Sequence, residues 1–235
     1  MSGLMRFWHS TIGKKVVMAV TGIIGIGFVV GHMAGNLQMF YGNGEEPMYK
    51  YAKLLRISMP ALYAVRGVLL VAVLLHILAA WQLTQMARAA RPLDYVQRTP
   101  KVTTLAAKTM RWGGVLLLTF IIVHILQITL GVSFLMPGFV HLDPYNNLRL
   151  TFANPLWTGF YVLSMAALAL HLYHGGWAVV RTLGVARPSQ SPLKRRVSLI
   201  IAIVVAVGFA VVPIAATLGV FEEQPPAVLS DPEAH

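Results

Sequence analysis

The chain has 235 residues, of which 57% are hydrophobic and only 11% are charged, and its formal net charge is +11. Its mean hydropathy of +0.67 exceeds what one soluble core requires, so the composition excludes an ordinary soluble domain and predicts an integral membrane protein. The Lys and Arg residues crowd the ends of apolar segments, which indicates contact with lipid headgroups rather than with nucleic acid. There is no cysteine, so disulfides, thiolate-bound iron–sulfur clusters and thioether-linked prosthetic groups are excluded.

Five apolar stretches approach the roughly 20 residues that a helix needs to cross a bilayer. In chain order they run from about Val16 to Phe40, Met59 to Ala87, Trp112 to Met136, Pro155 to Val180 and Val197 to Val220. We therefore predict an all-α fold, an integral membrane bundle of five helices within residues 1–220. Residues 221–235 are predicted to form a polar, acidic tail.

The charge of the connections predicts the topology. The N-terminus and the second and fourth connections hold 14 of the 19 Lys and Arg residues, and the opposite side holds 5. By the positive-inside rule, the N-terminus is expected to be cytoplasmic and the acidic tail to lie outside. An odd number of spans agrees with this split.

Four histidines lie inside four different apolar stretches: His32, His76, His124 and His171. An ionisable side chain within a membrane span is costly, and it usually faces the bundle interior, where it pairs, relays protons or binds a cofactor. Neutral imidazole is also a common metal ligand. Two pairs of such histidines predict two six-coordinate haems stacked across the bilayer.

The depth of each histidine follows from its distance to the nearest cytoplasmic Lys or Arg at 1.5 Å per helical residue. It is roughly 26 Å for His32, 20 Å for His124, 18 Å for His76 and 15 Å for His171. This order favours an outer pair of His32 with His124 and an inner pair of His76 with His171. Helix tilt exceeds the difference between His124 and His76, so depth alone leaves the pairing open.

A flat porphyrin needs room on the helix face beside its ligand. Both His76 and His171 have Ala or Gly four residues before and after them, whereas His174 is preceded by Leu170 at that spacing. We therefore predict that His171 is the ligand of the fourth span. His174 is then expected to donate a hydrogen bond to a ligand, contact a propionate or belong to a quinone site.

Several motifs together resemble a known family. They are STIGKKVVMAVTG, GHMAGNLQMF, ARPLDY, MRWGG, FIIVHI, DPYNN and HLYHGGWAVVRTLG. The combination is similar to the dihaem cytochrome b membrane anchor of bacterial succinate:quinone oxidoreductases, in the single-chain, five-helix form. The resemblance extends from about Ser10 to Leu218.

The resemblance implies two b-type haems with His32, His124, His76 and His171 as ligands, and it pairs the first span with the third and the second with the fourth. One position departs from part of the family. Some fumarate reductases of this form have a glutamate two residues before the fourth-span ligand for proton transfer, and here that residue is Ala169. A proton route through such a carboxylate is therefore not expected.

The resemblance also implies an anchor and electron-transfer subunit of succinate dehydrogenase or fumarate reductase in the bacterial plasma membrane. Its partners are expected to be a flavoprotein subunit with FAD, an iron–sulfur subunit, membrane lipid and a quinone, menaquinone in most dihaem members. The resemblance leaves a higher oligomer of the whole complex open. The chain alone has neither cysteines nor a dinucleotide-binding glycine motif, so we do not expect it to oxidise succinate by itself.

Several polar residues on the outer side are candidates for the quinone site. They are Glu45, Glu46, Tyr49, Lys53, Arg56 and Arg66. Arg66 lies ten residues outward of His76, where it is placed to bond a haem propionate or quinone oxygen. The alternative is an interfacial arginine that extends to lipid headgroups. The same two alternatives apply to the basic residues at the inner edge, namely Lys14, Lys15, Lys108 and Arg111.

Other classes of membrane protein also place histidines in their spans. The cytochrome b subunit of a formate dehydrogenase or hydrogenase would do so with a different helix number, ligand spacing and partner. A transporter or proton channel more often has intramembrane carboxylates or broken helices, and the five stretches contain no Asp or Glu. A cofactor-free anchor would leave four intramembrane histidines unexplained.

Overall fold

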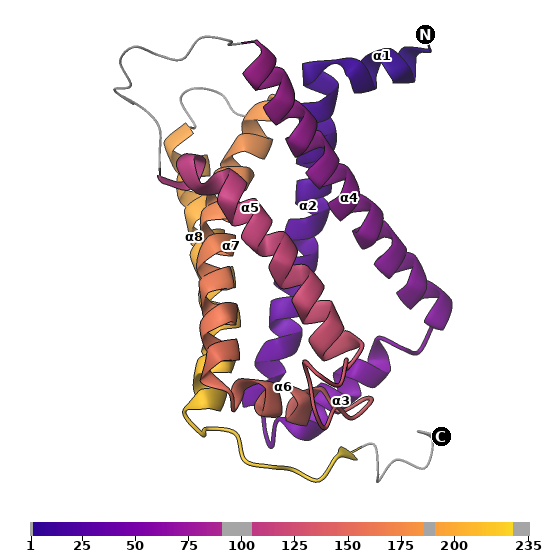
Figure 1. The fold of residues 1–235 in the computed structure, drawn as a ribbon, viewed down its shortest axis with the longest axis vertical. Coiled ribbons are helices and arrows are strands. Elements are labelled where there is room, and N and C mark those ends of the chain that lie inside the picture. Colours follow the sequence, from indigo (N-terminus) through magenta and orange to yellow (C-terminus); the bar gives the residue numbers. More distant parts are fainter. Residues whose placement is uncertain (1, 91–104, 186–190, 228–235) are drawn as a thin grey trace.

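The structure is a computed structural model that describes residues 2–90, 105–185 and 191–227. These residues form helices and no strands (Figure 1). The elements are α1 (Gly3–His9), α2 (Thr11–Leu37), η1 (Gln38–Phe40), α3 (Glu45–Leu54), α4 (Met59–Ala89), α5 (Leu105–His124), η2 (Ile125–Thr129), α6 (Pro144–Phe152), α7 (Pro155–Thr182) and α8 (Ser191–Thr217). Four basic residues of the connections that were expected to be cytoplasmic lie outside the described ranges: Arg91, Arg98, Lys101 and Arg187.

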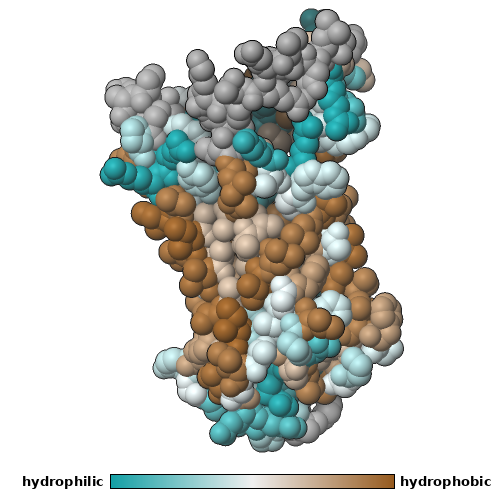
Figure 2. Space-filling model, turned by 60° about the vertical axis from the view of Figure 1, so that its left-hand side comes forward, coloured by the Kyte–Doolittle hydropathy of each residue, from teal (hydrophilic) through white to brown (hydrophobic). Residues whose placement is uncertain are grey.

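Five helices are long and apolar enough to cross a membrane, which confirms the predicted all-α five-helix bundle and a multi-pass membrane protein. They are α2 with η1, α4, α5 with η2, α7 and α8, and their most apolar windows have mean hydropathies of 1.4 to 2.9. Their apolar side chains form a band between two hydrophilic ends (Figure 2). The short helix α1 lies at one end, which we call the α1 end, and α3 and α6 lie at the other, the α3–α6 end (Figure 1).

Four of the spans begin and end within a few residues of the predicted positions, but the third differs by seven residues at each end. It was expected from Trp112 to Met136, and the structure places it from Leu105 to Thr129. The apolar run continues past Thr129, yet the helix stops because Gly131 adopts a left-handed backbone with φ +59°. The span predicted from apolar composition therefore includes residues that form an irregular loop in the structure.

The helices begin at residues whose side chains accept hydrogen bonds from the first turn. Ser10 accepts from Gly13 N at 2.9 Å, and Asp143 accepts from Asn146 N at 3.0 Å. Ser58 and Asn154 occupy the same position in α4 and α7. Each of these residue types has a short oxygen-bearing side chain that satisfies a backbone N–H otherwise left without a partner.

The spans α2, α7 and α8 pack against one another, α4 packs on α2, and α5 packs on α7. The most extensive of these contacts join α7 to α8, α2 to α4 and α5 to α7. The larger apolar cluster lies at the α3–α6 end and includes Met39, Tyr145, Phe152 and Phe221. Neither α2 with α5 nor α4 with α7 is among the closely packed helix pairs in the described ranges.

The first seven residues of the predicted tail pack against the bundle. The Tyr145 hydroxyl donates to Glu222 O at 2.8 Å, and Asn146 Nδ2 donates to Gln224 O at 2.9 Å. Arg149 forms an ion pair with Glu223 at 3.1 Å. The segment Phe221–Ala227 therefore covers α6 at this end, and residues 228–235 of the tail lie outside the described ranges.

We expect Gly131→Ala to destabilise the protein by at least about 1 kcal/mol, because a left-handed backbone disfavours any Cβ by roughly 1–2 kcal/mol. The new Cβ would also lie 2.2 Å from the Phe139 ring. Chemical unfolding in detergent, followed by tryptophan fluorescence, measures the change. The matched control is Gly159→Ala within α7, where a Cβ meets no atom within 4 Å. Equal unfolding midpoints for the two variants would contradict this account of how α5 ends.

Candidate functional site

The outer pair of histidines comes together between α2 and α5. The ring centroids of His32 and His124 are 5.9 Å apart, with an interplanar angle of 75°. A phenylalanine four residues earlier stacks on each ring, Phe28 at 5.3 Å and Phe120 at 5.5 Å. These stacked rings restrict the rotation of both imidazoles.

The inner pair comes together between α4 and α7. The ring centroids of His76 and His171 are 6.0 Å apart at an interplanar angle of 50°. No ring contact of His174 is found within the described residues, so His171 is the α7 histidine that faces His76. The four histidines thus form the two pairs expected from the sequence, one from each of four spans.

The ring separations suit a shared metal ion. Metal–imidazole bonds are about 2 Å long, so an ion between two rings places its ligand nitrogens about 4 Å apart and the ring centres roughly 6 Å apart. Both pairs have this separation. Two imidazoles in direct hydrogen-bond contact would have nitrogens about 3 Å apart and closer ring centres.

Each pair bridges two helices that do not pack closely along their backbones in the described ranges. α2 meets α5 through His32 and His124, and α4 meets α7 through His76 and His171. Beside His171, a Cβ built on Gly175 would meet no atom within 4 Å. A planar group around a metal requires such spacing, since it extends sideways from the axis that joins the two ligands.

A chain of hydrogen bonds fixes the tautomer of His124. Gln127 is fully buried and donates from Nε2 to Leu135 O at 3.2 Å, so its Oε1 accepts from the Tyr161 hydroxyl at 3.0 Å. The Tyr161 oxygen lies 3.3 Å from His124 Nδ1. Because that hydroxyl proton is already directed at Gln127, Nδ1 is the donor and Nε2 keeps its lone pair for a metal. Gln127 lies in η2, a π-helical turn of the kind often found at functional sites.

Thr21 has the same role beside His76. Its hydroxyl donates to Val17 O at 2.8 Å, and its oxygen lies 3.1 Å from His76 Nδ1. The proton on His76 is therefore on Nδ1, and Nε2 has the lone pair. Thr21 belongs to α2, so this hydrogen bond also joins α2 to α4.

His171 differs from its partner. Its Nδ1 is buried and has no hydrogen-bond partner among the described residues. A buried ring nitrogen without a partner is unfavourable, and Gln82 Oε1 in α4 is unpaired in the same way. A haem iron takes four ligands from the porphyrin and needs only two from the protein, so two histidines per site fit a haem. No group of three or more His, Asp or Glu residues is found in the described ranges, as a metal held by protein ligands alone usually requires.

The polar residues that the sequence suggested for a quinone site on the outer side have different surroundings. Arg66 is exposed on α4, with its guanidinium 5.9 Å from the centroid of the Tyr63 ring. Arg56 donates to Ala52 O at 3.0 Å, and burial, followed by repulsion from Arg66, lowers the pKa of its guanidinium. Glu45 is 4% exposed and accepts from Ala227 N at 2.5 Å, beneath the C-terminal segment. None of these contacts brings Arg66 to a paired histidine.

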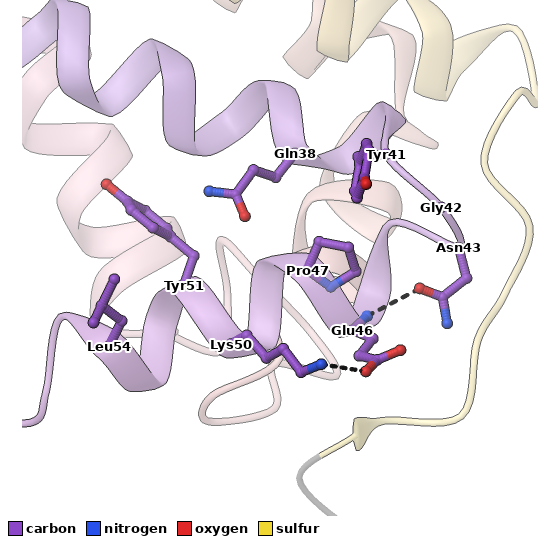
Figure 3. Close-up of a pocket in the computed structure, with 9 residues that line it drawn as sticks. All are labelled: Gln38, Tyr41, Gly42, Asn43, Glu46, Pro47, Lys50, Tyr51 and Leu54. Atoms are coloured by element: carbon purple, nitrogen blue, oxygen red, sulfur yellow. Dashed lines mark hydrogen bonds and ion pairs between the residues drawn. The ribbon is translucent and has the colours of Figure 1, made fainter.

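A hollow of about 670 Å³ opens at the α3–α6 end, between the end of α2 and α3 (Figure 3). It is lined by Gln38, Tyr41, Gly42, Asn43, Glu46, Pro47, Lys50, Tyr51 and Leu54. Glu46 accepts from Lys50 at 2.6 Å at its rim. Of the sequence candidates for the quinone site, Glu46 alone lines this hollow, and the paired histidines do not line it.

The basic residues that the sequence suggested at the inner edge also have different surroundings. Lys14 is buried and donates to Trp8 O, which fastens α1 to α2. Lys15, Lys108 and Arg111 are exposed at the α1 end. The partners of the histidines, Thr21, Gln127 and Tyr161, were not singled out in the sequence. Gln127 carried a usable signal, because an amide within an apolar span three residues after His124 needs an internal partner.

Comparison with protein-family models, with curated proteins and with solved structures finds no match for this chain.

Removing the Tyr161 hydroxyl should leave His124 Nδ1 and Gln127 Oε1 without partners. We expect Tyr161→Phe to lower the free energy of unfolding by about 1–3 kcal/mol, the cost of an unsatisfied buried polar group. Thermal unfolding in detergent measures it. The control is Tyr63→Phe on the exposed face of α4. The assigned hydrogen-bond chain is wrong if Tyr161→Phe is no less stable than the control.

The pH dependence of stability should depend on Glu45. Burial raises the pKa of the Glu45 carboxyl above its ordinary value of 4.5, and the nearby Asp143 and Glu46 add to the rise against the bond from Ala227. The folded state therefore holds a proton that the unfolded state has lost, so this contribution to stability falls as pH increases from 4.5 through the raised value.

Melting temperatures between pH 4 and 8 test this expectation, and Glu45→Gln should flatten the decline. Glu46→Gln is a second comparison: the bond to Lys50 lowers the pKa of Glu46, and the charge of Glu46 also adds to the rise in the pKa of Glu45. An unchanged pH profile in Glu45→Gln would exclude Glu45 as the source.

Proposed function

We propose that this protein is the membrane anchor and electron-transfer subunit of a bacterial succinate:quinone oxidoreductase, either a succinate dehydrogenase or a fumarate reductase. In this proposal it passes electrons between an iron–sulfur subunit and a membrane quinone through two bis-histidine b-type haems. The observation that carries the proposal is the pairing of four intramembrane histidines from four spans into two pairs with ring centroids 5.9 and 6.0 Å apart.

The positions of the pairs along α2 support a route across the membrane. Thr21 contacts the inner pair, and His32 of the outer pair follows eleven residues later. At 1.5 Å per residue these contacts are roughly 16 Å apart along the helix. Two such sites at different depths suit electron transfer through the bilayer. A single structural metal ion would need only one histidine pair.

The chain's own residues orient the ligands. Tyr161 and Thr21 accept the Nδ1 proton of His124 and His76, so each Nε2 is unprotonated and held in one direction. Haem, when bound, supplies reversible one-electron chemistry to this site. His32 with His124, and His76 with His171, would hold the two haems. The apolar spans around the pairs keep water away from them.

The two ends of the bundle support the proposed partners. The basic α1 end supports docking of a flavoprotein and an iron–sulfur subunit from the cytoplasm, because complementary charge directs such association. The hollow of Figure 3 supports a quinone site at the α3–α6 end, where the side chains of Gln38 and Tyr51 offer hydrogen-bonding groups beside Leu54. Menaquinone is the quinone that the resemblance favours.

The first experiment is haem stoichiometry by pyridine haemochrome on the purified complex, with its subunits identified in the same sample. We expect two haems b per copy together with a flavoprotein and an iron–sulfur protein. A different quinone-linked dehydrogenase among the subunits would favour a formate dehydrogenase or hydrogenase cytochrome instead. A well-folded preparation without haem would refute the electron-transfer proposal.

Histidine variants test the pairing. His171→Ala and His76→Ala should each remove one haem and leave the spectrum of the outer haem, while His32→Ala and His124→Ala should do the reverse. Loss is expected because a single remaining imidazole holds the iron on one side only. His141→Ala, in an exposed loop, is the matched control and should keep two haems. Retention of both haems in any of the four variants would contradict the assigned ligands.

A further inference from the structure

A second hollow, of about 400 Å³, lies between α7 and α8 at the α1 end of the bundle. It is lined by Tyr173, Trp177, Pro192, Arg195, Arg196 and Leu199. None of these residues takes part in the histidine pairs or in the quinone candidates. The lining thus contains two arginines, two aromatic residues with a polar group on the ring, and the apolar residues Pro192 and Leu199.

The guanidinium of Arg195 is positioned by contacts with Tyr173. Its Nε donates to the Tyr173 hydroxyl at 2.5 Å, and its guanidinium carbon is 5.7 Å from the centroid of that ring. Both contacts leave the two terminal nitrogens as donors in a planar fork, which matches the oxygens of a phosphate. Arg181 lies against Trp177 in the same way, at 5.8 Å.

No carboxylate in the described ranges is near enough to neutralise these arginines. Every Asp and Glu of the described residues lies at the α3–α6 end: Glu45, Glu46, Asp143, Glu222 and Glu223. Within the described residues, the exposed Arg195 and Arg196 therefore have no carboxylate beside them. Their positive charge is complementary to an anionic ligand.

The hollow is separate from the inner histidine pair. Tyr173 follows His171 by two residues, which at 3.6 residues per turn places it about 200° around α7. Tyr173 and Trp177 are four residues apart and share one face. Tyr173 and Trp177 therefore lie on a different face of α7 from His171, and neither His76 nor His171 lines the hollow.

Its position is the membrane interface. α7 ends at Thr182 and α8 begins at Ser191, so the arginines lie one turn into the span and the aromatic rings lie beside them. Below the arginines, Leu199 is 43% and Ile200 59% exposed, and they continue the apolar band. Charged donors above an exposed apolar surface fit a phosphate that has acyl chains attached, rather than a free phosphate ion.

We propose that this hollow binds the phosphodiester headgroup of an anionic phospholipid from the leaflet at the α1 end. The Arg195 fork and Arg196 hold the phosphate oxygens, the aromatic side chains border the headgroup, and Leu199 and Ile200 contact the acyl chains. The site does not depend on haem or on the proposed partners, so its test is independent of the proposed function.

The test titrates phosphatidylglycerol or phosphatidylcholine into the full-length protein in non-ionic detergent and counts bound lipid by native mass spectrometry. We expect phosphatidylglycerol to bind at least tenfold more tightly. Arg195→Gln with Arg196→Gln should reduce that affinity at least tenfold, and Tyr173→Phe should reduce it less, since it only frees the fork. Arg88→Gln removes a positive charge at the same end outside the hollow and should have little effect. Circular dichroism verifies that each variant is folded.

Several results would overturn the proposal. Equal affinity for the two lipids would exclude recognition of the anionic headgroup. If Arg88→Gln lowers the affinity for phosphatidylglycerol as much as the double variant does, the effect is due to the overall charge and not to this hollow. Displacement by inorganic phosphate at the lipid's own concentration would make this a phosphate site. Loss of phosphatidylglycerol when subunits co-purify, with full binding to the isolated chain, would assign the surface to a protein partner.

Discussion

The absence of water from the bilayer core is the constraint on which the rest of this structure depends. Every polar side chain within a span has to find a partner inside the protein, or it destabilises the fold. Ser164 is fully buried and bonds to Phe160 O, and Gln127 bonds to Leu135 O. The four paired imidazoles each have at most one nitrogen with a described partner, and the rings face one another in pairs. Gln82 Oε1 in α4 is also buried without a described partner, so it is the pairing of the rings that sets the histidines apart.

The way the helices pack creates the space between those pairs. α7 lies against α5 and α8, and α4 lies against α2, while α2 and α5, like α4 and α7, approach one another mainly through histidine rings. Close packing along every helix pair would have filled the same volume with apolar side chains. The bundle therefore has less interhelical contact at the positions of the four paired histidines.

The two ends of the bundle differ in charge and in covering. The α1 end has basic residues without carboxylates in the described ranges, so it suits anionic headgroups and acidic partner surfaces. At the α3–α6 end, α3, α6 and Phe221–Ala227 form a layer over the spans, joined by the Arg149–Glu223 ion pair and by the bonds of Tyr145 and Asn146. A small hydrophobic molecule reaching the outer pair from this side meets that layer first.

The sequence by itself determined the five spans, because about 20 consecutive apolar residues have few alternatives to a membrane helix. It also determined which histidines lie within them and favoured His171 over His174, since small neighbours four residues away are a local property of one helix. Only the tertiary structure decided where α5 ends, because Gly131 breaks the helix inside an apolar run that hydropathy cannot divide. It also decided which histidines meet, as depths that differ by about 2 Å do not separate His124 from His76. The hydrogen bonds of Tyr161 to His124 and of Thr21 to His76 join residues 37 and 55 positions apart, and such contacts follow from how the helices are arranged in space rather than from any local pattern.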